Sequence, residues 1–183
     1  PLAFFMGRRV RIYPHNSLLN LAHYHREVIN RKVDSGEQDA LVLDCMSCII
    51  ALAFSVEAIV NFVGANRIRD WKERSYYDKK MKQVAGISGL TFDATKEPYA
   101  TVEKLKTIRD RMAHGQPIEA MKKISSGVLP KEAMCAPWEA LLTPSFVNDS
   151  YHQVTRFRDA LLKAARIPLA ATLTSAIGGA LES

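Results

Sequence analysis

The sequence lacks the signals of a disulfide-stapled or metal-binding protein. Its three cysteines are few and odd in number, which does not suggest a disulfide framework. Cys45 and Cys48 form a Cys-x-x-Cys pair inside a continuous apolar run, with no helix start or preceding strand to activate a thiol, so packing in the core is the better interpretation. A zinc site would need two further ligands, and Cys135 with scattered histidines offers no paired motif. We therefore expect no metal and no cofactor.

Targeting segments and long apolar runs are also missing. The opening PLAFFM is a short apolar run, and its arginines follow rather than precede it. The apolar stretch CMSCIIALAFSV is bounded by Asp44 and Glu57, and the tail IPLAATLTSAIGGAL is short and rich in Thr, Ser and Gly. Neither reaches the roughly 20 residues of a membrane-spanning helix. We expect a soluble cytoplasmic protein without a membrane partner.

What is present is the composition of a globular domain. The 183 residues are 48% hydrophobic and 24% charged, which suits one domain with a sizeable core. We therefore predict a single domain over residues 1–183. Lysine and arginine number 25 against 19 acidic residues, for a net charge of +6. This balance favours anionic partners such as nucleic acid.

Apolar residues recur at helical spacing, and no segment has the alternation of a clear β-strand. The fold class is therefore all-α. The predicted helices cover residues 17–34 (capped by Asn16 or Ser17), 38–63 (closed by Gly64), about 66–84 (reset at Ser75), 98–114 and about 145–165. Between and around them we expect a flexible arm at 1–15, an irregular connector at 117–137 and a tail at 168–183 that frays or docks.

Two charged residues fall where apolar ones are expected. The helix over 38–63 is apolar on most of its circumference, yet it contains Glu57 and, four residues later on the same face, Asn61. Arg109 falls in the apolar sector of the helix over 98–114 and needs a carboxylate, backbone carbonyls, an interface or an anionic ligand to offset desolvation. We predict that Glu57 pairs with Arg109 or with a neighbouring polar residue. The plainer interpretation is that this pair only fixes helix register.

The end of the same helix carries His114, followed by Gly115 as a predicted C-terminal cap. The helix dipole there favours the imidazolium form, and Asp110, one turn earlier, can accept a hydrogen bond from the ring. The plainer interpretation is an ordinary helix-terminal histidine. Arg109 and His114 lie about 140° apart on an ideal helix, so a second chain could complete the site. A dimer with two such helix ends facing one cleft would gather cations around a phosphate.

A basic tract precedes this region. Residues 66–82, NRIRDWKERSYYDKKMK, hold seven Lys or Arg against three acids, with Trp71 and two tyrosines interleaved. The plainer interpretation is a solvated helix face. The alternative is an RNA-binding surface, for which the candidate residues are Arg67, Arg69, Lys72, Arg74, Lys79 and Lys80, with Arg111 as a further contact to flanking phosphates.

The segment of Arg109, Asp110, three further residues, His114 and Gly115 resembles the R-polar-x-x-x-H signature of the HEPN superfamily, whose usual local form is close to RNxxAHG. The upstream ALAFSVEAIVNFVG resembles that family's second core helix, in which an acidic residue and a following Asn recur in an apolar run. Together these segments span roughly residues 38–116.

The resemblance implies a HEPN-like bundle of about four to five core helices that acts as a dimeric, metal-independent endoribonuclease. It assigns catalysis to Arg109 and His114, with Asp110 as the intervening polar residue and Glu57 and Asn61 in supporting positions. It also implies a toxin or antiviral effector, with an inhibitory antitoxin as a partner. Asp110 replaces the more usual Asn and adds negative charge near an RNA phosphate. The alternatives are a noncatalytic HEPN-like module that binds nucleotide, RNA or a protein, and an unrelated helical adaptor.

Overall fold

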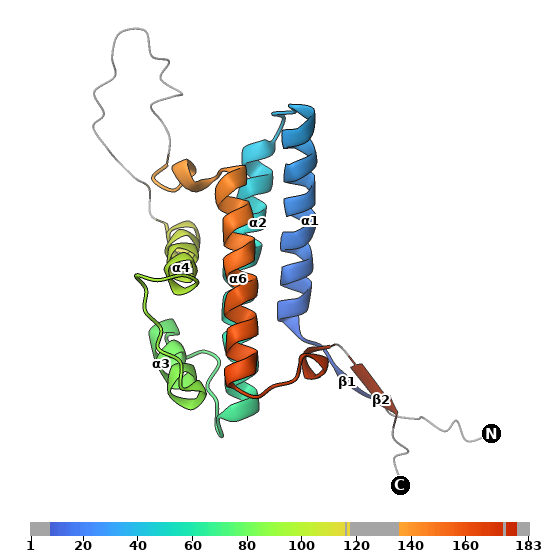
Figure 1. The fold of residues 1–183 in the computed structure, drawn as a ribbon, viewed down its shortest axis with the longest axis vertical. Helices are drawn as coiled ribbons and strands as arrows, with labels where there is room; N and C mark the ends of the chain where they lie inside the picture. Colours follow the sequence, from blue (N-terminus) through green and yellow to red (C-terminus); the bar gives the residue numbers. More distant parts are fainter. Residues whose placement is uncertain (1–7, 116, 118–135, 174, 179–183) are drawn as a thin grey trace, which may run out of the picture.

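The chain forms a bundle of α-helices with a short two-stranded ribbon beside it (Figure 1). The computed structural model describes residues 8–115, 117, 136–173 and 175–178. In order, these residues form β1 (Arg8–Arg11), α1 (Pro14–Ser35), α2 (Leu41–Arg67), α3 (Tyr77–Ser88), α4 (Tyr99–Ala113), the 3-10 helix η1 (Glu139–Leu141), α6 (Pro144–Ala164), the 3-10 helix η2 (Leu169–Thr172) and β2 (Ser175–Gly178). The predicted all-α fold class is confirmed. The predicted connector at 117–137 lies largely outside the described residues.

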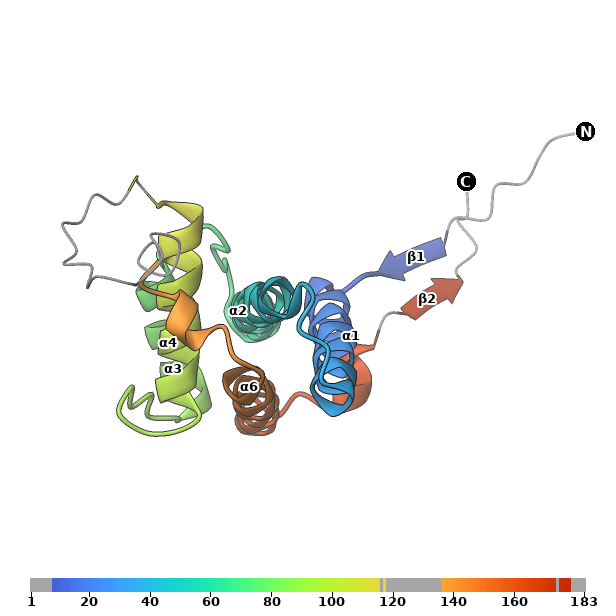
Figure 2. The ribbon, with the colours of Figure 1, turned by 90° about the horizontal axis from the view of Figure 1, so that it is seen from above.

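Helix α2 is the centre of the bundle. Figure 2 shows α1 on one side of it, α3 and α4 on the other, and α6 against a third face. Helices α1, α2 and α6 run side by side, whereas α4 is seen end-on in Figure 1 and lengthwise in Figure 2, so it crosses the other three. This crossing leaves the C-terminal end of α4 at the edge of the bundle.

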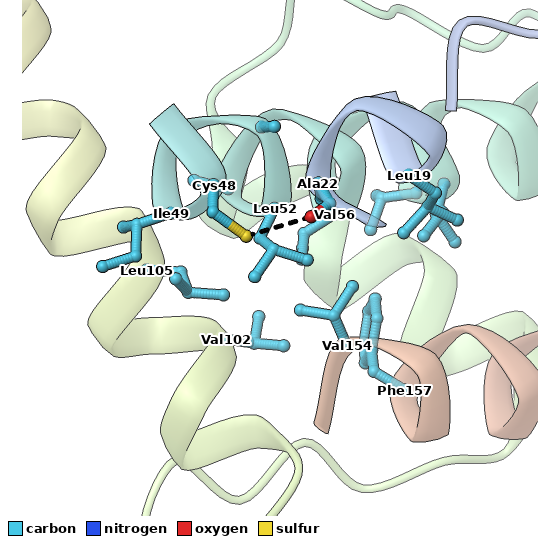
Figure 3. Close-up of a cluster of buried hydrophobic side chains, with 14 of the residues drawn as sticks. Leu19, Ala22, Cys48, Ile49, Leu52, Val56, Val102, Leu105, Val154 and Phe157 are labelled. Atoms are coloured by element: carbon cyan, nitrogen blue, oxygen red, sulfur yellow. Dashed lines mark hydrogen bonds between the residues drawn. The ribbon is translucent and has the colours of Figure 1, made fainter. Parts of the chain in front are cut away.

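The core forms where α2 meets α1, α4 and α6 (Figure 3). Leu52 of α2 and Leu105 of α4 are fully buried, and Phe157 of α6 is 1% exposed. The thiol of Cys48 donates a hydrogen bond to the carbonyl oxygen of Ala22 in α1, at 3.2 Å (Figure 3). Burial raises the pKa of Cys48 to about 12. The prediction that the Cys-x-x-Cys pair packs in the core is therefore confirmed, because both of its thiols are buried and free.

The expectation that no segment is long enough to cross a membrane does not hold for α2. This helix has 27 residues, and its most apolar window has a mean hydropathy of 2.1. Asp44 and Glu57 do not interrupt it, so by length and composition alone it could span a bilayer. Within the bundle, 67% of that window is buried. Burial against the other helices accounts for the same apolar composition.

The helix predicted to begin near Asn66 begins at Tyr77 instead. Helix α2 does not end at Gly64 but continues to Arg67, and the chain then reverses through Asp70, whose φ of 60° lies in the left-handed region. The reversal lays the Trp71 indole on Gly64, so closely that a methyl group on Gly64 would collide with the ring. The chain therefore turns back after α2 and packs the Trp71 indole against Gly64, so no helix begins near Asn66.

The two ends of the described chain pair with each other. Strand β1 runs antiparallel to β2, with Arg8 opposite Gly178 and Arg11 opposite Ser175. The described part of the predicted tail, residues 168–173 and 175–178, therefore docks, and the Asn16 side chain donates a 2.6 Å hydrogen bond to the Thr172 carbonyl oxygen. The predicted arm at 1–15 is wrong for residues 8–15, and Asn16 does not cap α1, which begins at Pro14. Residues 1–7 lie outside the described part.

Candidate functional site

Three helices meet at a cluster of charged side chains around Glu57. One carboxylate oxygen of Glu57, on α2, accepts a hydrogen bond from Arg109 of α4, and the other accepts one from Lys80 of α3 at 2.5 Å. The predicted pair of Glu57 and Arg109 is confirmed. Lys80 is 1% exposed, and its ammonium group also donates to the Glu73 carbonyl oxygen at 3.0 Å. A buried ammonium group needs such partners to offset its lost hydration.

Asp110 holds Arg109 from the other side. Its Oδ1 accepts hydrogen bonds from Nε and Nη2 of Arg109, at 3.0 and 2.7 Å. Burial lowers the pKa of the Arg109 guanidinium, but the hydrogen bonds and charges of Asp110 and Glu57 outweigh burial and raise it overall. Asp110 was predicted to orient the His114 ring. Among the described residues its carboxylate bonds Arg109 instead, because the neighbouring guanidinium lies within reach.

The aromatic ring of Tyr77 extends the cluster toward α3. The guanidinium carbon of Arg109 lies 5.8 Å from the ring centroid, and the ammonium of Lys106 lies 5.4 Å from it. Such distances allow cation–π attraction. The Tyr77 hydroxyl is buried without a hydrogen-bond partner in the described part of the chain, and burial raises its pKa. Arg109 is thus fixed by two carboxylates and one aromatic face.

A hollow of about 600 Å³ opens beyond this cluster, at the C-terminal end of α4. Its walls are formed by Thr107, Asp110, Arg111, His114, Gly115, Pro137 and Trp138. His114 is exposed, and its backbone N–H donates to the Asp110 carbonyl oxygen at 2.9 Å. Gly115 passes so close to the Arg111 carbonyl oxygen that a side chain there would collide with it. The glycine therefore allows the tight turn that presents the imidazole at the rim.

The structure does not tie Asn61 into this site. Asn61 lies one turn after Glu57 on α2 and is half-buried. Its side-chain oxygen is buried and has no hydrogen-bond partner among the residues the structure describes. Within the described chain, no contact of this oxygen therefore supports the predicted role of Asn61.

The six candidate RNA-binding residues of the basic tract divide into three groups. Arg69, Lys72, Arg74 and Lys79 are exposed on the loop before α3 and in its first turn. Arg67 instead donates to the carbonyl oxygens of Ala165 and Arg166, at 2.7 and 2.6 Å, and so ties α2 to the end of α6. The prediction of Lys80 as an RNA contact is wrong, because its side chain is buried beneath the tract and bonded to Glu57.

The sequence prediction gave Lys80 the wrong role and did not include Trp138 in the site. Lys80 stands three residues after Tyr77 and four before Val84, so it occupies the apolar stripe of α3, and that position signals a buried lysine. Trp138 carries no comparable signal, because the segment that places it against α4 contains no periodic pattern.

Within the described ranges, no three His, Cys, Asp or Glu side chains gather closely enough to hold a metal ion. Comparison of the chain with protein-family models, with curated proteins and with solved structures finds no match.

Proposed function

We propose that this protein is a HEPN-like endoribonuclease that cleaves RNA without a metal ion, by attack of a ribose 2′-hydroxyl on the adjacent phosphate. The observation that carries the proposal is the exposed His114, five residues after the anchored Arg109, at the rim of a hollow that Arg111 also lines. A histidine side chain can accept and donate protons near neutral pH. A nearby cation can stabilise charge that develops on phosphate oxygens.

The proposed reaction needs two proton transfers. As the bond between the 2′-oxygen and phosphorus forms, a base removes the hydroxyl proton. As the bond between phosphorus and the 5′-oxygen breaks, an acid protonates the leaving oxygen. The products are a 2′,3′-cyclic phosphate and a 5′-hydroxyl. His114 of one protomer would serve as base and His114 of a second protomer as acid.

The main role of Arg109 would be to hold the phosphate in place by hydrogen bonds. Its contacts with Glu57 and Asp110 use Nε, Nη1 and Nη2, but each terminal nitrogen carries a second hydrogen that can still bond a phosphate oxygen. The charges of Lys80 and Arg109 are balanced by those of Glu57 and Asp110. Extra positive charge for the phosphate would therefore come from Arg111 and His114.

An exposed apolar stripe supports the proposed homodimer. Leu43 and Phe54 of α2 are 62% and 42% exposed, and Ile50 between them is half-buried. Phe54 stands two residues from the buried Leu52 and Val56, so it faces away from the core. In Figure 2 the face of α2 away from α6 and the C-terminal end of α4 lie on the same side. A second copy seated there would approach the His114 hollow.

A noncatalytic HEPN-like module is the second candidate, and the state of Arg109 favours it. The Arg109 side chain is 13% exposed, and its guanidinium is already bonded to two carboxylates. An arginine held in this way can serve register alone, while the hollow binds nucleotide, RNA or a protein partner. The antitoxin partner remains a prediction of the nuclease alone, and the cytoplasmic location remains a prediction of both candidates.

RNA cleavage in the presence of EDTA separates the two candidates. We expect the wild-type protein to cleave RNA, with cyclic phosphate ends identified by mass spectrometry. We expect His114→Ala to lower the rate at least about 100-fold, since general acid–base groups contribute that much. His152→Ala is the matched control, because His152 is also exposed but lies on α6. If several RNAs stay intact, or if both variants cleave like wild type, the binding module becomes the better description.

A further inference from the structure

The wall of the hollow opposite α4 is formed by Pro137 and Trp138, from the segment before α6. Trp138 is half-buried against the core. Its segment is held by a 2.9 Å hydrogen bond from the Ala136 N–H to the Glu139 side chain and by a 3.0 Å bond from the Leu141 N–H to the Trp138 carbonyl oxygen. Leu142 then enters the core at 4% exposure. The backbone on both sides of Trp138 is therefore held in place.

Trp138 borders a second, smaller hollow of about 280 Å³. Its lining includes the apolar side chains of Ala100, Ile108 and Leu141, and it shares Arg111, Thr107 and Pro137 with the first hollow. One aromatic side chain and one exposed arginine thus belong to both spaces. The larger space adds His114 and Asp110, and the smaller one adds those apolar side chains together with Glu103 and Lys104.

This arrangement has the chemistry of a nucleotide subsite. Aromatic side chains bind unpaired bases by stacking on either ring face, and they tolerate every base because each has a π-face. Arginine and protonated histidine bind the phosphate that follows. Bases inside a duplex are already stacked and cannot reach an indole in a recess.

We propose that Trp138 is the stacking surface for an unpaired base of single-stranded RNA, with the adjoining phosphate placed between Arg111 and His114. The proposal rests on the proposed function of the same hollow and names its substrate class. Trp138 belongs to the binding machinery here, and it takes no part in proton transfer.

The test measures binding of a labelled 2′-O-methyl RNA strand, which lacks the attacking hydroxyl and cannot be cleaved by the proposed reaction. We expect Trp138→Leu to weaken the Kd about tenfold, the lower part of the range for loss of one stacked base. Trp138→Phe should stay within about threefold of wild type, since a benzene ring also stacks. Trp71→Phe is the matched control, because Trp71 is the protein's other tryptophan and packs on Gly64.

A strand with abasic positions tests the base itself. Wild type should bind the abasic strand about tenfold more weakly, and Trp138→Leu should show little difference between the two strands. A duplex of the same sequence should bind more weakly than the single strand. If Trp138→Leu does not fold, as judged by circular dichroism, the comparison of base-containing and abasic strands on wild type and Trp138→Phe still decides the question.

Three outcomes would overturn the proposal: equal binding of base-containing and abasic strands by wild type, duplex binding as tight as single-strand binding, or no binding of any strand at low salt. Cleavage of ordinary RNA, assayed in parallel, keeps the two ideas apart. If binding depends on Trp138 but no RNA is cleaved, the nuclease proposal is wrong and the subsite proposal stands. If Trp138→Leu cleaves RNA with an unchanged KM, the subsite proposal is wrong and the nuclease proposal stands.

Discussion

Replacing Glu57 with alanine should destabilise the fold more than its partial exposure suggests. The Glu57 side chain is 31% exposed, but its partners Lys80 and Arg109 are only 1% and 13% exposed. Without Glu57, the ammonium of Lys80 keeps, among the described residues, only the Glu73 carbonyl oxygen, whereas Arg109 keeps Asp110. Removing one partner of a buried ion pair costs about 3–5 kcal/mol. Because Arg109 retains a carboxylate, we expect the lower value, about 3 kcal/mol.

Chemical denaturation of three variants measures this effect. Glu57→Ala should lower the free energy of unfolding by about 3 kcal/mol, which for a chain of this size lowers Tm by roughly 6–12 °C. Lys80→Met removes the buried charge and leaves Glu57 with Arg109, so it should cost less than about 1 kcal/mol. The double variant contains no buried lysine without a carboxylate partner. Its loss in free energy of unfolding should therefore be smaller than the sum of the two single losses by about 2 kcal/mol.

The exposed Glu27 on α1 provides the control. Glu27→Ala should change the free energy of unfolding by no more than about 0.5 kcal/mol. The reasoning fails if Glu57→Ala costs less than about 1 kcal/mol. It also fails if the double variant loses the full sum of the single losses, because the burial of Lys80 would then not depend on Glu57.

Two further changes probe other parts of the bundle. Gly64→Ala should lower the free energy of unfolding in urea by about 1–3 kcal/mol, the usual cost of overpacking, because the added methyl group meets the Trp71 indole. Gly86→Ala is the control and should cause no such loss, because there is open space around Gly86. Burial, helped by the charge of Arg158, lowers the pKa of His15 below its ordinary value of 6.5. The unfolded chain therefore binds the proton more readily, and stability should be full above pH 6.5 and decline as the pH falls below it. His15→Gln should show a smaller loss of stability over this pH range than wild type. An equal loss in the two proteins would contradict the assignment to His15.

Most of the helical framework could be predicted from apolar periodicity. The predicted helices over 17–34, 98–114 and 145–165 lie within a few residues of α1, α4 and α6. The start of α3 could not be predicted, because the loop before it is set by the packing of Trp71 on Gly64, seven residues earlier in the chain. The ribbon was missed because each strand has only four residues and its partner lies at the other end of the described chain.

The candidate site was predictable in part. An arginine and a glutamate at apolar positions of two helices predict each other, because neither can be buried alone. The partner of Asp110 was predicted wrongly, since spacing along a helix favoured His114 and gave no weight to the adjacent Arg109. The position of Lys80 was read as part of a charge run rather than as part of the stripe with Tyr77 and Val84. Charge runs say little about which member turns inward.

The ribbon of β1 and β2 has a consequence for the order of folding. Helices α1 and α2 are neighbours in sequence and can dock as soon as both have formed. The two strands enclose nearly the whole described chain, so their pairing must close the longest loop among the contacts of the described residues. Contacts between distant segments form slowly unless intervening structure has already brought them together. We therefore expect the ribbon to close last, after the helices have assembled, and during synthesis only once residues 175–178 have left the ribosome.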